Sequence, residues 1–198
     1  MSSSDFTAKA VLENPRRIPK SKMIVFDAQV FLGSSKPAII CSLRLFNDAN
    51  NEFAKIGCYV VVVHPACTTP TLKVYSQELT PIDFQIFGDI VWMNYIGSHE
   101  NFDLRQHTIV HVAGPATNVN RDDATFEIHA GQYLSATKNA DNVFPVQCLF
   151  PNTKRWESYK PIPGKGKPVL IEGLVTGVER NDNRTVKYFI VDLLKVTF

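Results

Sequence analysis

The chain has 198 residues, of which 44% are hydrophobic and 20% charged, and its formal net charge at pH 7 is +2. This composition is typical of globular proteins and excludes the disordered and fibrous classes. The apolar runs, such as Tyr59 to Val63, are far shorter than the roughly 20 residues that cross a bilayer, and the first residues lack the layout of a secretory signal. We therefore expect an intracellular protein, nuclear or cytoplasmic, with no membrane association.

Residues 1–22 begin with a serine-rich stretch, show no sustained periodicity and end in the basic cluster of residues 15–22. We interpret them as a flexible basic arm. Its basic cluster fits a nuclear-import signal, a phosphate-contacting arm or a merely solvated tail, and the sequence does not choose among the three.

After residue 22, apolar and polar residues alternate with a period close to two, which predicts strands. No segment offers a convincing amphipathic helix, so many short strands predict an all-β barrel or sandwich. The expected strands are residues 24–31, 38–46, 57–64, 84–92, 108–113, 125–133, 143–150, 169–178 and 185–197.

A weak internal repeat becomes visible when the chain is aligned with itself at an offset of 85 residues. The first four expected strands then fall on the next four without a gap. We infer two similar β domains, residues 23–105 and 106–198. A single large β-sandwich is the competing architecture.

Each predicted domain carries a glycine in a late strand, Gly88 within residues 84–90 and Gly173 within residues 169–175. This pattern and the order of the strands resemble the OB-fold, a five-stranded Greek-key barrel, as found in single-stranded DNA-binding proteins of the replication protein A group. The resemblance implies two tandem small Greek-key barrels. It is incomplete, because the first domain lacks an obvious fifth strand and the second lacks the usual helix between strands three and four.

The resemblance also implies a ligand lying across strands two and three and the loops that join strands one–two and four–five. Single-strand binders combine cations for the backbone with aromatic faces for the bases. Residues 151–168 hold five Lys/Arg against one Glu, a net charge of +4, interleaved with aromatic residues. The expected nucleic-acid-binding residues are Arg121, Tyr133, Lys138, Lys154, Arg155, Trp156, Tyr159, Lys160, Lys165, Lys167, Arg180 and Arg184.

The motifs of common enzymes and metal sites are missing from the sequence, which contains no GxSxG, HExxH or GxGxxG and no zinc-type cysteine spacing. His107, His111 and His129 could meet across adjacent strands, but we expect no metal, no cofactor and no catalytic residue. Four cysteines are expected as free thiols: Cys41, Cys58, Cys67 and Cys148.

We therefore predict a non-enzymatic protein that binds single-stranded DNA or RNA through the second domain. The alternative is a protein-interaction or assembly scaffold, with a partner or self-association through the first domain, whose residues 23–105 have a net charge of −3. By default we expect three aromatic residues of that domain to pack in the core or between the domains: Trp92, Tyr95 and Phe102. Otherwise they form a binding surface. A carbohydrate or small-ligand site at Trp92 or Trp156 is a third alternative.

Overall fold

The computed structural model describes residues 2–33, 36–53, 55–69, 73–76, 78–98, 106–135, 137 and 142–198. These residues form ten strands and one helical turn, so the all-β prediction is confirmed. No helix in the described part of the chain has the length and apolar character needed to span a membrane. The elements are β1 Ser3–Arg17, β2 Met23–Val30, β3 Ile39–Phe46, β4 Ile56–Cys67, β5 Ile86–Gly97, β6 Thr108–Asn120, β7 Thr125–Gly131, β8 Val143–Leu149, α1 Lys154–Glu157, β9 Pro168–Arg180 and β10 Val186–Thr197.

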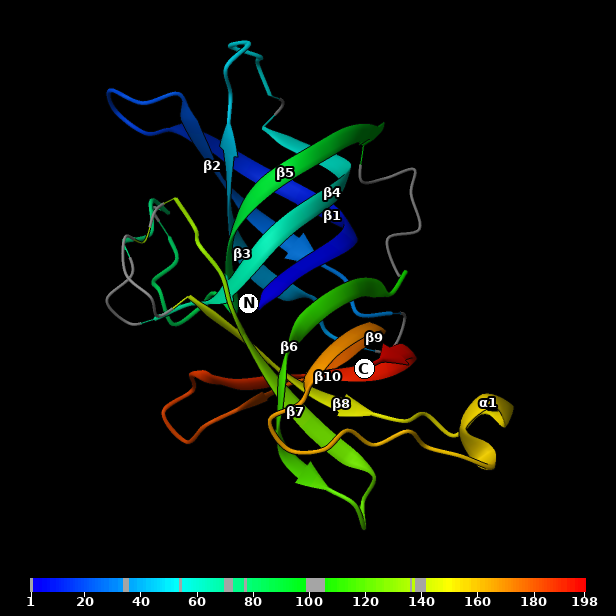
Figure 1. Cartoon of the computed structure of the whole chain (residues 1–198). Coiled ribbons are helices and arrows are strands. Elements are labelled where there is room, and N and C mark those ends of the chain that lie inside the picture. Colours follow the sequence, from blue (N-terminus) through cyan, green and yellow to red (C-terminus); the bar gives the residue numbers. More distant parts are fainter. Residues whose placement is uncertain are drawn as a thin grey trace.

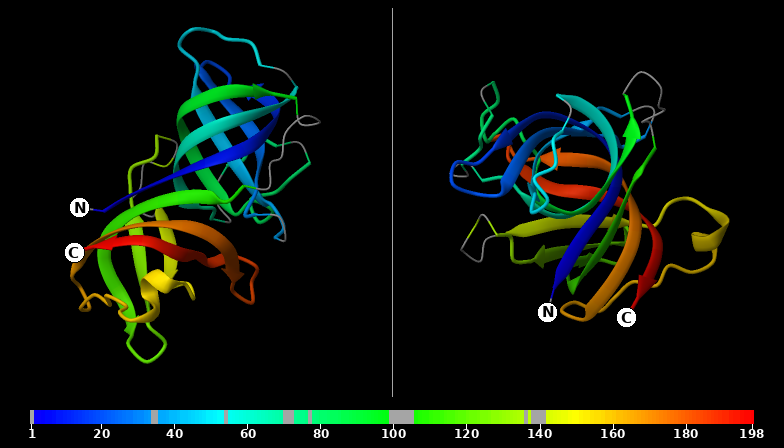
Figure 2. Two further views of the ribbon diagram at one scale, coloured as in Figure 1. Left: turned by 90° about the vertical axis from the view of Figure 1, so that its right-hand side faces the viewer. Right: turned by 90° about the horizontal axis from the view of Figure 1, so that it is seen from above.

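The strands close into two rings with the same order of pairing (Figures 1 and 2). In the first ring β1 pairs with β2, β2 with β3, β3 with β5, β5 with β4, and β4 again with β1. In the second ring β6, β7, β8, β10 and β9 follow the same order. The β3–β5 and β8–β10 pairs are parallel and the others antiparallel. The interpretation of the rings as two tandem Greek-key barrels and the division into two domains stay predictions.

Alternate side chains point inward along each strand and fill the interior of both rings. In β1 the inward positions are Phe6, Ala8, Ala10 and Leu12, all buried. The interior of the second ring holds more aromatic side chains, and the rings of Phe144 and Phe189 stack there with centroids 4.6 Å apart.

The interpretation of residues 1–22 as a flexible arm is wrong, because residues 3–17 are the strand β1. It is also the strand that the first predicted domain lacked, so that domain does not begin at residue 23. The alternation along this strand is weak in the sequence because its apolar positions include the small residues Ala8 and Ala10, which contrast little with their polar neighbours.

The repeat at an offset of 85 residues paired the wrong strands. It aligned β2 with β6 and β5 with β9, whereas the pairing order makes β1 the equivalent of β6 and β4 the equivalent of β9. Gly88 and Gly173 are therefore not counterparts, since they lie in the fifth strand of one ring and the fourth of the other. Alternating apolar strings align with each other in many registers, so the ungapped match carried little information.

Strand β1 also joins the two rings. Residues Ser3 to Thr7 pair with Ile109 to Ala113 of β6, while Phe6 to Glu13 pair with β4. The two ladders overlap, so β1 lies between β4 and β6 in one continuous sheet (Figure 2).

A second contact between the rings is the connection that follows β7. Leu134 is fully buried there against Ala66 and Phe87 of the first ring. Ser135 binds the Arg44–Asp89 ion pair, because Arg44 donates to Ser135 Oγ at 3.0 Å and the Ser135 N–H donates to Asp89 Oδ2 at 3.0 Å. This connection is therefore part of the interface between the rings.

Gly173 lies where β9 approaches β10 too closely for a side chain. A Cβ atom there would collide with Cγ1 of Val191 and would stand 2.8 Å from the carbonyl oxygen of Asp192, which cannot rotate away. We expect Gly173→Ala to lower the free energy of unfolding by about 1–3 kcal/mol, measured by urea denaturation. The matched control is Gly131→Ala in β7, where a Cβ would meet its nearest neighbour, Ser2 Oγ, at 3.9 Å. Equal destabilisation of the two variants would contradict this reasoning.

Candidate nucleic-acid interface

The connection between β8 and β9, residues 150–167, projects from the second ring (Figure 1) and is called here the basic connection. It is fixed by Trp156 in the helical turn α1. The indole Nε1–H donates to the carbonyl oxygen of Leu193 at 3.1 Å, and the ring packs edge-on against Phe150 with centroids 5.0 Å apart. Trp156 is only 6% exposed. The prediction that Trp156 stacks on bases is therefore wrong, because its ring faces the protein interior.

The other residues of the basic connection that were predicted to bind nucleic acid lie near Trp156 in the sequence and face solvent. Lys154, Arg155 and Lys160 are exposed, and the Tyr159 side chain is 72% exposed. The Arg155 guanidinium lies 4.8 Å from the centre of the Trp156 ring, so the buried indole also positions a cation.

Lys165 and Lys167 are exposed at the other end of the basic connection, on a turn that is bound to β6. The Gly166 N–H donates to the Ala116 carbonyl at 2.7 Å, and the Ala116 N–H donates to the Lys167 carbonyl at 2.9 Å. Gly166 has φ of +78°, a backbone conformation that favours glycine. Both ends of the basic connection are thus held by the ring while its cations remain in water.

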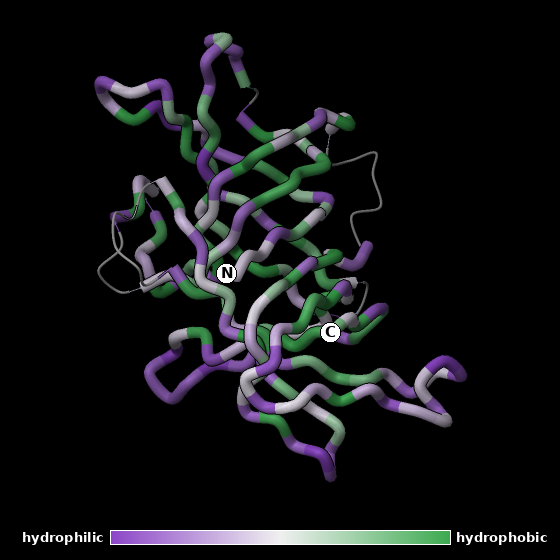
Figure 3. Tube along the Cα trace, in the orientation of Figure 1, coloured by the Kyte–Doolittle hydropathy of each residue, from purple (hydrophilic) through white to green (hydrophobic). Residues whose placement is uncertain are grey.

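The remaining predicted cations lie elsewhere. Arg180 and Arg184 belong to the β9–β10 turn, where Arg180 donates to the Arg184 carbonyl at 2.6 Å. In Figure 1 this turn and α1 project from opposite sides of the second ring, and Arg121 lies on the β6–β7 turn at its lower end. All three projections are hydrophilic (Figure 3). The structure therefore divides the described cations of the predicted set among three places.

Arg180 also lines a groove between the two rings with a volume of about 860 Å³. Lys36 and His107 contribute further basic groups to this groove, and Asp192 contributes a carboxyl. Burial raises the pKa of Asp192, and the neighbouring His107 opposes that rise. The groove is the second place where a phosphate would meet cations.

The outer face of β7 and β8, where the resemblance placed the ligand, does not carry the expected chemistry. Its central positions are Glu127, His129 and Gln147, so it presents a carboxylate and, apart from the His129 imidazole, no aromatic ring. Glu127 binds both Asn118 and His129, at 2.8 and 3.0 Å. The connection beyond this face leads to Tyr133, which is exposed. Lys138 lies outside the described residues.

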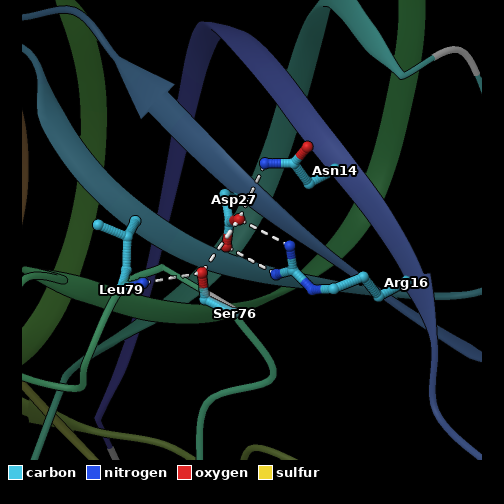
Figure 4. Close-up of polar contacts among 5 residues, drawn as sticks. All are labelled: Asn14, Arg16, Asp27, Ser76 and Leu79. Atoms are coloured by element: carbon cyan, nitrogen blue, oxygen red, sulfur yellow. Dashed lines mark hydrogen bonds and ion pairs between the residues drawn. The ribbon is translucent and has the colours of Figure 1, made fainter.

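The first ring contains a partly buried ion pair that removes one cation from the predicted phosphate-contacting cluster. Both Nη groups of Arg16 donate to the carboxylate of Asp27, each at 2.6 Å, and Asn14 and Ser76 approach the same carboxylate (Figure 4). Arg16 therefore ties β1 to β2. Arg17 and Lys20 of the same cluster remain exposed.

Trp92 and Tyr95 are 52% and 56% exposed, so the default expectation that they pack in the core is wrong. Phe46 is 60% exposed as well, although the sequence predicts no role for it beyond its strand. Phe102 lies outside the described residues.

Among the described residues, the cysteines are the candidate nucleophiles, and the His, Cys, Asp and Glu side chains are the candidate metal ligands. Burial raises the pKa of all four cysteine thiols, that of Cys67 to about 12, so the reactive thiolate is disfavoured. Within the same residues, no group of three His, Cys, Asp or Glu side chains is placed to hold a metal ion. His111 is bound instead to Asp5 at 3.0 Å.

No protein-family model matches this sequence, and no curated protein sequence is significantly similar to it. Among solved structures, the fold is similar to a deletion mutant of the single-stranded DNA-binding protein from Thermus aquaticus. The two chains are 14% identical with a TM-score of 0.45, and the match covers 98% of this chain and 93% of that one. Similarity at this level carries no functional conclusion, so function rests on the surface described above.

We expect Trp156→Ala to lower the free energy of unfolding by about 3–5 kcal/mol, because it empties a buried site. Trp156→Phe keeps a ring but leaves the Leu193 carbonyl without its donor, and we expect a loss of about 1–3 kcal/mol. Chemical denaturation of both variants measures these losses. A Trp156→Ala protein of unchanged stability would restore the interpretation of this residue as an exposed stacking group.

Proposed function

We propose that the chain binds single-stranded nucleic acid, that each ring is an OB-like barrel, and that the basic connection of the second ring makes the main contact. The observation that carries the proposal is that five cations and an exposed tyrosine lie on one connection, which is fixed at both ends. Because the backbone of this connection is already fixed, little backbone entropy is lost when its exposed cations bind a phosphate backbone.

A single strand fits this connection better than a duplex. Tyr159 is exposed among Lys154, Arg155 and Lys160, and a stacking partner for its ring requires an unpaired base. Such a surface reads backbone and base faces without hydrogen bonds to particular base edges. The proposal therefore includes low sequence preference.

The groove between the rings provides a second, weaker contact in this proposal. Arg180 and Lys36 line it from opposite rings, so a strand that occupies it would touch both. Arg180 stands at the β9–β10 turn, which projects from the opposite side of the second ring to α1 of the basic connection, so a strand that contacted both would have to pass around the ring (Figure 1).

Charge reversal of Lys154 and Arg155 tests the proposal. We expect the double variant to bind labelled oligo(dT) of about 30 nucleotides at least tenfold more weakly. The decrease of log affinity with log salt should also become shallower, its slope losing about 1.4 in magnitude. Fluorescence anisotropy at several salt concentrations gives both numbers. The control is Arg17→Glu with Lys20→Glu, which changes the net charge equally on the first ring. Equal losses in both double variants would mean that only the total charge matters and would contradict the assigned surface.

Tyr159→Ala separates base stacking from phosphate contact. We expect it to weaken single-strand binding by about 1–3 kcal/mol while leaving the salt slope unchanged, because a neutral ring is removed. Competition by duplex DNA of the same length provides the comparison. A variant that binds single strands as tightly as the parent protein would exclude stacking by Tyr159.

A further inference from the structure

One end of β5 extends beyond its neighbour in the first ring. The parallel pairing of β3 with β5 ends at Leu45 and Ile90, whereas β5 continues to Gly97 and pairs there with β4 alone among the described strands. Val91 to Gly97 therefore present one backbone edge without a strand partner in the described part of the chain. Such edges are templates for an added strand, and proteins usually cover them.

Beside this edge lies a hollow at the end of the first ring, called here the aromatic mouth, with a volume of about 650 Å³. Phe46 is 60% exposed there, and Val91, Trp92 and Tyr95 are each more than half exposed. Tyr95 packs edge-on against Tyr59 with ring centroids 5.3 Å apart, so its ring is held in place. Several aromatic faces thus meet solvent next to an open backbone edge.

The charge at the aromatic mouth is negative. Asp48 and Glu52 are exposed and line it, neither forms an ion pair among the described residues, and no Lys or Arg of that part of the chain contributes to the lining. Lys22 reaches the same loop from outside, where its ammonium donates to the Asp48 carbonyl at 3.4 Å. Carboxylates and aromatic faces together attract cations and repel phosphates.

We propose that the aromatic mouth binds an extended, lysine- or arginine-bearing segment of a partner protein. The segment adds a strand to the free edge of β5, which supplies backbone hydrogen bonds, and alternate side chains enter the mouth. Its cationic side chains lie over the aromatic rings and near Asp48 and Glu52. This site is on the other ring from the basic connection, so it does not depend on the proposed nucleic-acid function.

The test uses a fluorescein-labelled peptide of alternating lysine and valine, about eight residues long to match an ordinary strand. A glutamate–valine peptide of equal length is the matched probe. We expect the lysine peptide to bind with measurable anisotropy change and the glutamate peptide not to bind. Trp92→Ala and Glu52→Lys should each weaken the lysine peptide at least about tenfold.

Tyr133→Ala is the control variant, because it removes an exposed aromatic side chain outside the mouth, and it should change peptide affinity by less than about twofold. The charge reversal of Lys154 and Arg155 should likewise leave peptide binding intact, which separates this proposal from the nucleic-acid one. Equal binding of the two peptides, or full affinity in both Trp92→Ala and Glu52→Lys, overturns the proposal. So does a loss of oligo(dT) affinity of at least about tenfold in Trp92→Ala, which would assign the mouth to nucleic acid.

Discussion

The pairing of β1 on both of its edges is the interaction on which the rest of the structure depends. Phe6 and Thr7 face β4 on one side and β6 on the other, so a few residues belong to two ladders at once. Without β1 the first ring cannot close, and β6 loses a neighbour at the same time. The inward side chain of Phe6, fully buried, adds apolar packing to this backbone constraint.

Because β1 joins both rings in one sheet, it fixes the position of the surfaces of one ring relative to those of the other. The buried contact of Leu134 and the hydrogen bonds of Ser135 to Arg44 and Asp89 fix the arrangement from a second direction. The β3–β4 loop and the end of β5, whose residues line the aromatic mouth, lie at the end of the first ring that is far from the second ring, and the second ring carries the basic connection (Figures 1 and 2). A phosphate backbone and a cationic peptide could therefore occupy the molecule together without competing for charge.

Part of the candidate site could be predicted from local sequence. Lys154, Arg155, Tyr159 and Lys160 stand among polar neighbours, and all four are exposed. The same reasoning failed for Trp156, whose neighbours are equally polar, because its burial comes from Phe150 and Leu193, and Leu193 is distant in sequence. It also grouped loops that the ring holds apart, since proximity in a closed barrel depends on strand order and not on loop composition.

The sequence by itself determined that the protein is all-β, where most strands begin, and that basic charge concentrates between β8 and β9. These properties are local, because alternation, turn residues and charge can be read within a short window. Only the tertiary structure decided that residues 3–17 are the seam between two rings, that Trp156 is an anchor and that Trp92 and Tyr95 face solvent. Each of those outcomes depends on which distant strand covers a given edge or side chain, and a strand pattern of period two fits many such partners equally well.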